Sequence, residues 1–372
     1  MWLVAQFPAP LKGVDVCLLC GDRLSAVGRV AFRLAWSAGR VPSMRLLVLG
    51  GTQFVGRAVV QAALARGWDV SVFNRGSLGA VAGVEQLVGD RTVEGGLAAL
   101  GEGNWDAVVD TWAREPKAVQ SVAQLLRGRV GRYAYVSSLS VYTWAPPAGY
   151  DESAQVVEGE PGAGATDYAQ DKRGGELAAL DAFGAEASLF VRAGLILGPY
   201  ENIGRLPWWL ARIARGGDVL APGPRELALQ YIDARDLAEW VLGALEREVS
   251  GPVNLVTPQG HSTMGQLLDA CVSVTGSAAR LRWTDPETIL AAGIKPWTEL
   301  PVWVPPGTDM HDALHSADVS RAVGTGLACR PVEETVADTW TWLRSLGGEV
   351  PRRPDLTIGV PEEVEAKVLA GG

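Results

Sequence analysis

A glycine-rich turn, Gly50-Gly51-Thr52-Gln53-Phe54-Val55-Gly56, joins two segments with different hydrophobic patterns. Residues 45–49 before it form an unbroken apolar run, which is typical of a strand buried in a parallel sheet. Residues 54–66 after it have the spacing of an amphipathic helix, which Gly67 ends. Residues 69–73 form a second apolar run. This order of strand, turn, helix and strand is one βαβ unit, so the sequence predicts a parallel sheet covered by helices.

The alternation of strands and helices continues beyond this unit, which predicts a Rossmann-type α/β fold with a doubly wound parallel sheet. After Gly198-Pro199 the alternation weakens and Pro, Gly and Trp become frequent. This change favours a smaller C-terminal substrate lobe over the carboxyl edge of the sheet. The later segments expected are strands at 85–88, 107–110, 133–137 and 188–192 and helices at 117–127, 167–183, 234–246, 263–274 and 332–346.

Four regions are expected from these changes in pattern. Residues 1–43 carry a net positive charge in an otherwise acidic chain and are expected to be a poorly ordered extension. Residues 44–198 are expected to form the dinucleotide-binding domain, to which later segments return. Residues 199–346 are expected to form most of the substrate-binding lobe, and residues 347–372 a tail.

The glycine turn also predicts where a cofactor binds. Glycines let the backbone approach a pyrophosphate, whose charge meets the unpaired N–H groups at the start of the helix. Gln53 stands where the usual fingerprint has its middle glycine, so it is expected either to displace the cofactor slightly or to contact a phosphate. The cofactor contacts expected in this turn are Gly50, Thr52, Gln53, Phe54, Val55 and Gly56.

Residues after the next two strands indicate which dinucleotide is bound. An NAD site usually places Asp or Glu at the end of the second strand, whereas this chain has Asn74-Arg75. Because an arginine suits a 2′-phosphate, the sequence favours NADP(H), with NAD(H) possible. The alternative for Arg75 is a solvated turn residue. Asp90, after the third strand, is expected to bond the adenine amino group.

A phenol and an ammonium group, Tyr168 and Lys172, stand four residues apart on a predicted helix and therefore share one face. A nearby cation favours the ionised phenol, so Lys172 is expected to make Tyr168 an acid or base near neutral pH and to hold the nicotinamide ribose. Ser138, at the end of the strand before them, is expected to hydrogen-bond a substrate oxygen. Such Tyr–Lys pairs are common on helix surfaces, and here the preceding glycine turn and serine support the catalytic interpretation.

Over about residues 44–346 the chain resembles the extended short-chain dehydrogenase/reductase family, also called the NAD-dependent epimerase/dehydratase family. The resemblance rests on the glycine turn, Asp90, the Val-Ser-Ser-x-Ser-Val-Tyr run ending at Tyr142, Tyr168, Lys172, and residues 192–199 and 231–238. It implies that Ser138, Tyr168 and Lys172 are catalytic and that residues after Gly198 meet the substrate. It also implies a homodimer formed through the helices at 117–127 and 167–183.

Two departures from the family pattern leave a second interpretation open. Gln53 is found in the atypical branch of this family, some members of which are RNA-binding or regulatory proteins without catalysis. Trp112 lies in the segment that lines the nicotinamide and is expected to narrow the site. The prediction is an NAD(P)-dependent oxidoreductase that transfers hydride at a secondary alcohol or ketone carbon of a small molecule. It would act as a reductase, or as an epimerase or dehydratase on a sugar-like or nucleotide-sugar substrate. The alternative is a non-catalytic NAD(P)-sensing or RNA-binding protein.

Charge and composition exclude several partners. The formal net charge of −9 counts against a nucleic acid, whose phosphates need clustered Lys and Arg. No stretch reaches the roughly 18 apolar residues of a membrane-spanning helix. The 4 cysteines are too few and too scattered for a disulfide framework, which favours a reducing cytoplasm.

Three further patterns are given less weight. Neither Cys17-x-x-Cys20 nor the pair His311 and His315 has the additional ligands of a metal site, so no metal is expected. Arg205 and Arg225 are candidates for clamping an anion, with an ordinary surface role as the more common alternative. Of the tryptophans in the lobe, only one or two are expected to face the pocket, because tryptophan more often fills a core. These tryptophans are Trp208, Trp209, Trp283, Trp297 and Trp303.

Overall fold

The computed structural model describes residues 43–79, 81–351 and 356–371. The chain divides into a unit Met1–Val41 and a unit Pro42–Gly372. The expected extension, apart from Ser43, and the pair Cys17 and Cys20 lie outside the described residues. Within the described ranges no helix is long and apolar enough to cross a membrane.

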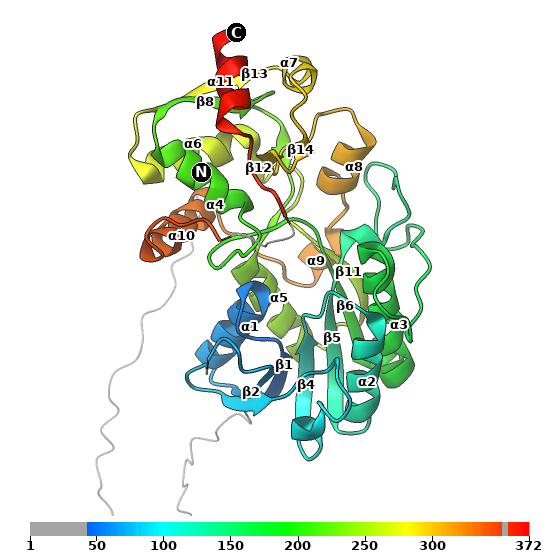
Figure 1. Cartoon of the computed structure of the whole chain (residues 1–372). Coiled ribbons are helices and arrows are strands. Elements are labelled where there is room, and N and C mark those ends of the chain that lie inside the picture. The colour runs from blue at the N-terminus through cyan, green and yellow to red at the C-terminus, as the bar shows by residue number, and fades with distance from the viewer. Residues whose placement is uncertain (1–42, 80, 352–355, 372) are drawn as a thin grey trace, which may run out of the picture. The chain divides into compact units, whose positions relative to one another are not determined.

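Strands and helices alternate from Arg45 onward, as the hydrophobic pattern predicts (Figure 1). The strands are β1 Arg45–Leu49, β2 Asp69–Asn74, β3 Glu85–Val88, β4 Trp105–Asp110, β5 Val130–Ser138, β6 Ser188–Ala193, β7 Ile196–Leu197, β8 Gly217–Pro222, β9 Ala228–Leu229, β10 Ile232–Asp233, β11 Gly251–Leu255, β12 Ser262–Thr263, β13 Ala279–Thr284, β14 Pro296–Trp297 and β15 Leu300–Pro301. The helices are α1 Phe54–Ala65, α2 Pro116–Leu126, α3 Tyr168–Ala187, α4 Arg205–Ala214, α5 Ala234–Glu246, α6 Met264–Thr275, α7 Pro286–Ala291, α8 Asp309–His315, α9 Ser320–Gly324, α10 Val332–Ser345 and α11 Glu362–Gly371, with short 3₁₀ turns η1 Ala98–Leu100 and η2 Leu139–Val141.

The main sheet has seven strands in the order β11-β6-β5-β4-β1-β2-β3, and all of its pairs are parallel. The chain runs outward from β1 to β3, then returns to the other side of β1 with β4. This reversal is the topological switch point of a doubly wound fold, where ligands bind beyond the carboxyl ends of the strands. The expected Rossmann-type sheet is therefore confirmed.

Helices cover both faces of this sheet and bury its alternating side chains. On one face α1 and α5 pack against each other and share a core that includes Val48, Val59 and Leu237. On the other face α2 and α3 pack together over Leu47, Val122 and Tyr133. Burial on both faces explains why the strands are nearly continuous apolar runs.

Several segments after β7 form a second core around α4, α6 and α10, whereas α5, β11 and α9 return to the core of the main sheet. Trp209 and Trp303 are completely buried there, and each indole N–H donates to a backbone carbonyl, of Pro301 and Gly223 respectively. The C-terminal helix α11 joins this core through Glu365, which pairs with Arg212 of α4 at 2.7 Å. Glu365 also accepts the backbone N–H of Leu220 in β8.

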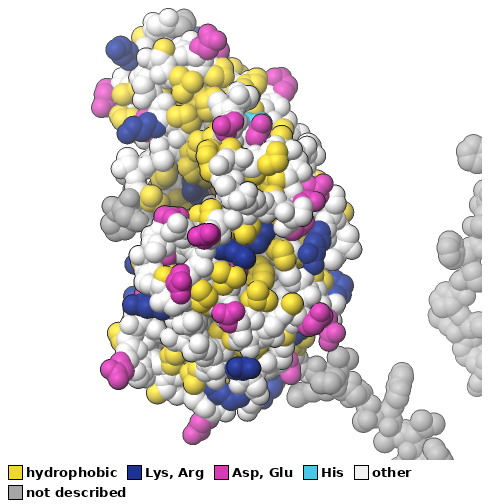
Figure 2. Space-filling view, turned by 90° about the vertical axis from the view of Figure 1, so that its right-hand side faces the viewer, with side chains coloured by type: hydrophobic (Ala, Val, Ile, Leu, Met, Phe, Trp, Pro, Cys, Tyr) yellow, Lys and Arg dark blue, Asp and Glu magenta, His cyan; other side chains and the backbone are white. Residues whose placement is uncertain are grey.

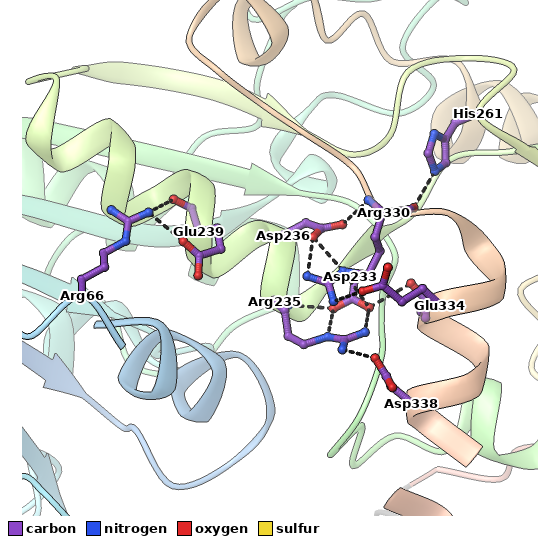
Figure 3. A network of polar contacts seen from close by, with 10 residues as sticks. Arg66, Asp233, Arg235, Asp236, Glu239, His261, Arg330, Glu334 and Asp338 are labelled. Carbon is purple, nitrogen blue, oxygen red and sulfur yellow. Dashed lines mark hydrogen bonds and ion pairs between the residues drawn. The ribbon is translucent and has the colours of Figure 1, made fainter. Parts of the chain in front are cut away.

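A network of charged side chains fastens α10 to the start of α5 (Figure 3). Asp233 is buried and caps α5, and its carboxylate also accepts hydrogen bonds from the Arg235 side chain and from the hydroxyl of Thr335 in α10. Arg235 reaches further to Asp338, and Arg330 pairs with Asp236 at 2.7 Å. The network therefore links the helix after β10 to the last long helix of the lobe.

Candidate active site

The glycine turn adopts backbone conformations that other residues rarely adopt. Gly50 and Gly51 have φ angles of 124° and 85°. A Cβ on Gly50 would lie 2.5 Å from Thr111 Oγ1, and one on Gly51 would lie 2.7 Å from a methyl carbon of Val72. A Cβ on Gly56 would lie 2.6 Å from the backbone nitrogen of Gly51, so the first turn of α1 packs directly on the loop. These glycines are required by close backbone packing, as the dinucleotide fingerprint demands.

The start of α1 is available to an anion. Gln53 is the N-cap residue, and its side chain makes no capping hydrogen bond. The first turn of α1 contains no acidic residue. Backbone N–H groups at such a helix start attract a phosphate, because they lack partners and carry the positive end of the helix dipole.

A cleft of about 270 Å³ opens at this turn, between the segments that follow β1 and β4. Its walls include most of the expected cofactor contacts, namely Gly50, Thr52, Gln53, Asn74, Arg75 and Asp90. Phe54 lines a different cavity, and Val55 and Gly56 are buried in α1. The cleft therefore lies at the switch point of the sheet, and the residues present fit a dinucleotide.

Side chains after β2 and β3 shape the far part of the cleft. Asn74 holds the loop together, since its Nδ2 donates to the Gly50 carbonyl and its Oδ1 accepts the N–H of Gly76. Asp90 accepts hydrogen bonds from the hydroxyl and the N–H of Thr92, which lower the pKa of its carboxyl, with a smaller contribution from Arg75. Arg75 itself lines the cleft, and the cleft also contains Arg114.

Asp110, at the end of β4, organises the wall of the cleft that contains Trp112. It is completely buried and accepts hydrogen bonds from Arg91, from the hydroxyl of Tyr133 and from the N–H of Trp112. Arg91 in turn lies 4.9 Å from the ring centroid of Trp112. The Trp112 indole is thus fixed in the wall of the cleft, at the place where the sequence predicts a narrowing.

A second and larger cavity, of about 690 Å³, contains the expected catalytic hydroxyls. Ser138 and Tyr168 both line it, although they lie 30 residues apart in sequence. Ser138 ends β5, and its Oγ accepts the N–H of Ser140 in η2 at 3.1 Å. Tyr168 begins α3 and is 51% exposed, in the turn that Asp167 caps through the N–H groups of Ala169 and Gln170.

Lys172 lies one turn further along α3 but lines neither cavity. Its Nζ donates to the carbonyls of Trp112 and Val136, both at 2.6 Å, and lies 4.8 Å from the ring centroid of Tyr135. Burial lowers the pKa of Lys172 to about 7, opposed by the charges of Asp110 and Glu176. Lys172 therefore links the backbone after β4, at Trp112, to the backbone of β5, at Val136.

A buried ion cluster supports the strand that ends at Ser138. Glu176 of α3 accepts hydrogen bonds from Ser137 and forms a two-point pair with Arg192 of β6. Arg192 also donates to the hydroxyl of Tyr142. Ser137 therefore has a structural role. Ser138, the serine that the sequence predicts to be catalytic, lies on the cavity wall.

Consecutive residues of the glycine turn line the cleft and the cavity. Gln53 lines the cleft and its neighbour Phe54 lines the cavity. Trp112, in the wall of the cleft, accepts a hydrogen bond from Lys172, one helical turn from Tyr168 in the cavity. A molecule held in the cleft would thus lie next to the pocket that contains both hydroxyls.

A model of the NAD dependent epimerase/dehydratase family matches residues 46–256, more than half of the chain. The chain belongs to this family. Membership confirms the resemblance inferred from the motifs and makes the chain an NAD(P)-dependent enzyme of the extended short-chain dehydrogenase type.

Relatives of this family member include enzymes that act on nucleotide sugars. A UDP-glucose 4-epimerase of Corynebacterium glutamicum is 28% identical, over 74% of this chain and 94% of its own length. The fold resembles the Bordetella bronchiseptica enzyme WbmH in complex with NAD⁺, with a TM-score of 0.61 and 18% identity over 82% of this chain and 99% of that one. It also resembles the Thermus thermophilus UDP-glucose 4-epimerase in complex with NAD, with a TM-score of 0.57 and 20% identity over 81% and 99%.

The structure separates the two arginines that the sequence offers as an anion clamp. Arg205 lines the cavity and lies 4.7 Å from the ring centroid of Trp297, which also lines it. Arg225 lies over Trp283 outside the cavity and pairs with Asp269, so the two do not form a clamp. Of the five lobe tryptophans only Trp297 faces the cavity, as the composition argument predicts.

Some residues of the site have no local signal in the sequence. Trp144 lines the cavity from the loop after η2, and Met310, Leu314 and Leu356 line it from distant segments.

His315 is buried and accepts the N–H of Gln230, and burial lowers its pKa to about 4. Across the part of the chain that is described, no group of three or more His, Cys, Asp or Glu side chains has the arrangement of a metal site.

Proposed function

We propose that this family member oxidises or reduces a secondary alcohol or ketone carbon in the larger cavity, with Ser138, Tyr168 and Lys172 as the catalytic set. When bound in the cleft, NAD(P) supplies or accepts the hydride. The hydroxyl of Tyr168 gives a proton to the substrate oxygen or takes one from it. Ser138 donates a hydrogen bond to the same oxygen and holds it on the cavity wall. At pH values below its pKa of about 7, Lys172 contributes positive potential under the first turn of α3, which favours the ionised phenol.

The lining of cleft and cavity by consecutive residues of the glycine turn carries this proposal. Hydride transfer needs donor and acceptor carbons to be held in contact. Gln53 and Phe54 are consecutive residues, yet one faces the cleft and the other the cavity that contains Ser138 and Tyr168. This arrangement supports a reaction centre where the two meet.

The cofactor is proposed to be NADP(H), bound by the turn residues, Asn74, Arg75 and Asp90. Three arginines, Arg75, Arg91 and Arg114, line the cleft, and no carboxylate directly follows β2. Arg91 is engaged by Asp110, so Arg75 is the better candidate for a 2′-phosphate. Replacing it in Arg75→Gln should weaken NADP⁺ binding by roughly 10-fold to 100-fold, the loss of a hydrogen-bonded charge pair. Calorimetric titration should show unchanged NAD⁺ binding, and an equal loss for both cofactors would contradict this role.

A second candidate is epimerisation of a nucleotide sugar. The named activity of the Corynebacterium glutamicum relative favours it. In that reaction the sugar carbon is oxidised and reduced again, so no net cofactor is consumed. A non-catalytic role in RNA binding has less support. Figure 2 shows Lys and Arg interspersed with Asp and Glu on the face it presents, without an extended basic patch among the described residues there.

The chain is further proposed to act as a homodimer in the cytoplasm. The helices α2 and α3 pack side by side on one face of the sheet and retain partly exposed apolar side chains, including Leu125, Leu180 and Phe183. Such a surface supports pairing with a second copy. Cys271 and Cys329 are both free thiols, which supports a reducing compartment. Light scattering on a size-exclusion column tests the dimer, which a monomeric mass would exclude.

Removing one hydroxyl tests the catalytic assignment. Tyr168→Phe should lower turnover by about 10² to 10⁴ in a screen of ketones, alcohols and nucleotide sugars, because the proton donor is lost. Tyr168 is half exposed, so folding and cofactor affinity should not change. Tyr200→Phe is the matched control, since its ring packs on Arg57 and Trp342 outside both cavities. Turnover by Tyr168→Phe at the parent rate would contradict the proposal.

A further inference from the structure

The C-terminal segment, residues 356–371, supplies part of the wall of the larger cavity (red in Figure 1). Leu356 lines this cavity, although it lies far from Ser138 and Tyr168 in the sequence. The family model matches residues 46–256, so neither Leu356 nor the helix α11 that follows it belongs to the matched part. This piece of the cavity wall is therefore not implied by membership of the family.

Helix α11 anchors the C-terminal segment to the lobe. Its Glu365 is buried, pairs with Arg212 of α4 at 2.7 Å and accepts the backbone N–H of Leu220 in β8. Val364 and Val368 of the same helix pack against the second core. Because a buried ion pair between two elements is costly to break, α11 has a fixed position on the lobe.

Gly359 fixes the stretch between α11 and Leu356. Its φ is 101°, and a Cβ at this position would lie 1.9 Å from Nε1 of Trp208 in α4, so only a residue without a side chain fits against the indole. The N–H of Gly359 donates to the carbonyl of Thr298 at 2.8 Å. Thr298 follows Trp297, which also lines the cavity. The contacts of Gly359 therefore hold Leu356 at the wall and join the C-terminal segment to the neighbour of Trp297.

We propose that the C-terminal segment determines which ligands the larger cavity accepts, with Leu356 contacting the substrate and Gly359 positioning Leu356. The inference rests on the function proposed above, in which the substrate occupies this cavity. Leu356 presents an apolar side chain to the cavity, as do Met310 and Leu314 of α8. Covering such a side chain with an apolar group of a ligand stabilises the complex. Leu356 therefore favours substrates that carry an apolar group.

Binding of a fluorescent ketone to the NADP⁺-loaded protein tests the role of Leu356. The probe is 6-propionyl-2-(dimethylamino)naphthalene, a neutral apolar ketone whose fluorescence rises in apolar surroundings. Leu356→Asn keeps the approximate size of the side chain but removes its apolar surface, so it should weaken probe binding about 10-fold. Leu356→Met restores an apolar side chain and should bind the probe like the parent. Leu346→Asn is the matched control, because Leu346 is 44% exposed and lines neither cavity, and its affinity should not change.

Gly359→Ala tests the positioning role. Its Cβ has no space against Trp208, so the C-terminal segment must shift, and probe affinity should fall about as far as in Leu356→Asn. Gly348→Ala is the control, since Gly348 has a φ of 83° but no atom outside its chain neighbours within 4 Å of its Cβ position. In the double variant Leu356→Asn, Gly359→Ala the two losses should not add, because both remove the same contact.

Three results would overturn the inference: an unchanged affinity in Leu356→Asn, additive losses in the double variant, or a parent protein that does not bind the probe. The proposed function is tested separately, by turnover. If Tyr168→Phe keeps the turnover of the parent, the proposed function fails. A probe affinity that depends on Leu356 would still support the role of the C-terminal segment in ligand selection.

Discussion

Gly51→Ala should weaken both folding and cofactor binding. Its loss of folding stability has two contributions, one from the backbone conformation and one from packing. The φ angle of 85° costs an alanine about 1 to 2 kcal/mol, because its Cβ crowds the backbone. The new Cβ would also lie 2.7 Å and 3.1 Å from the two methyl carbons of Val72 and 3.2 Å from one of Val60. Both valines are completely buried and have no space to move, so overpacking adds about 1 to 3 kcal/mol. Gly51→Ala should therefore lower the free energy of unfolding by about 2 to 5 kcal/mol.

Gly67→Ala separates the two parts. Gly67 follows α1, the helix that begins after the glycine turn, and has a φ of 72°. No atom outside its chain neighbours lies within 4 Å of the position of its Cβ. This variant should lose only the backbone part, about 1 to 2 kcal/mol. Urea unfolding followed by circular dichroism measures both values. NADPH at 100 times its Kd should stabilise the parent and Gly67→Ala by about 2.7 kcal/mol and Gly51→Ala by much less, because Gly51 lines the cleft. Equal losses in the two variants, with equal stabilisation by NADPH, would refute the steric argument.

Two other predictions concern buried charge. Asp233→Asn should lower the free energy of unfolding by about 1 to 3 kcal/mol, because it removes the buried carboxylate that pairs with Arg235, although Arg235 keeps its pair with Asp338. Glu239→Gln, which removes an exposed pair with Arg66, should cost less than about 1 kcal/mol, and similar urea midpoints for the two variants would contradict this. Lys172 has a folded pKa of about 7 against an ordinary 10.5, so between these pH values the unfolded chain binds a proton that the folded chain does not. Stability should therefore rise with pH in this window, by roughly 2 kcal/mol more from pH 7 to 9 in the parent than in Lys172→Met, and parallel pH profiles would refute the shift.

The parts of the fold that local patterns encode could be predicted. The helix at 234–246 is predicted with the bounds that the structure shows, because Asp233 caps it and its apolar face repeats every three to four residues. In contrast, α4 was not predicted, because Pro207 and the glycines on either side of this helix favour a loop, although its apolar residues share one face. The pair β8 and β13 joins residues about 60 positions apart, so no local pattern reveals it.

The site likewise combines features that local patterns encode with features that depend on the tertiary fold. Helical spacing places Tyr168 and Lys172 one turn apart, but the direction of the Lys172 side chain depends on the carbonyls of Trp112 and Val136. Sequence chemistry singled out Arg205 and Arg225 as equals. Only the tertiary fold distinguishes them, because it brings α4 to the cavity and leaves Arg225 beside Asp269.

The departure from the family pattern at Asp110-Thr111-Trp112-Ala113 connects the two halves of the site. The buried carboxylate of Asp110 accepts from Arg91 in the wall of the cleft and from the N–H of Trp112. The carbonyl of Trp112 in turn accepts from Lys172, one turn from Tyr168. An unbroken series of charged or polar contacts thus runs from the cofactor cleft to the helix that carries the proposed proton donor. Because each buried member would be costly to leave unpaired, these contacts hold the wall of the cleft and the first turns of α3 in one arrangement.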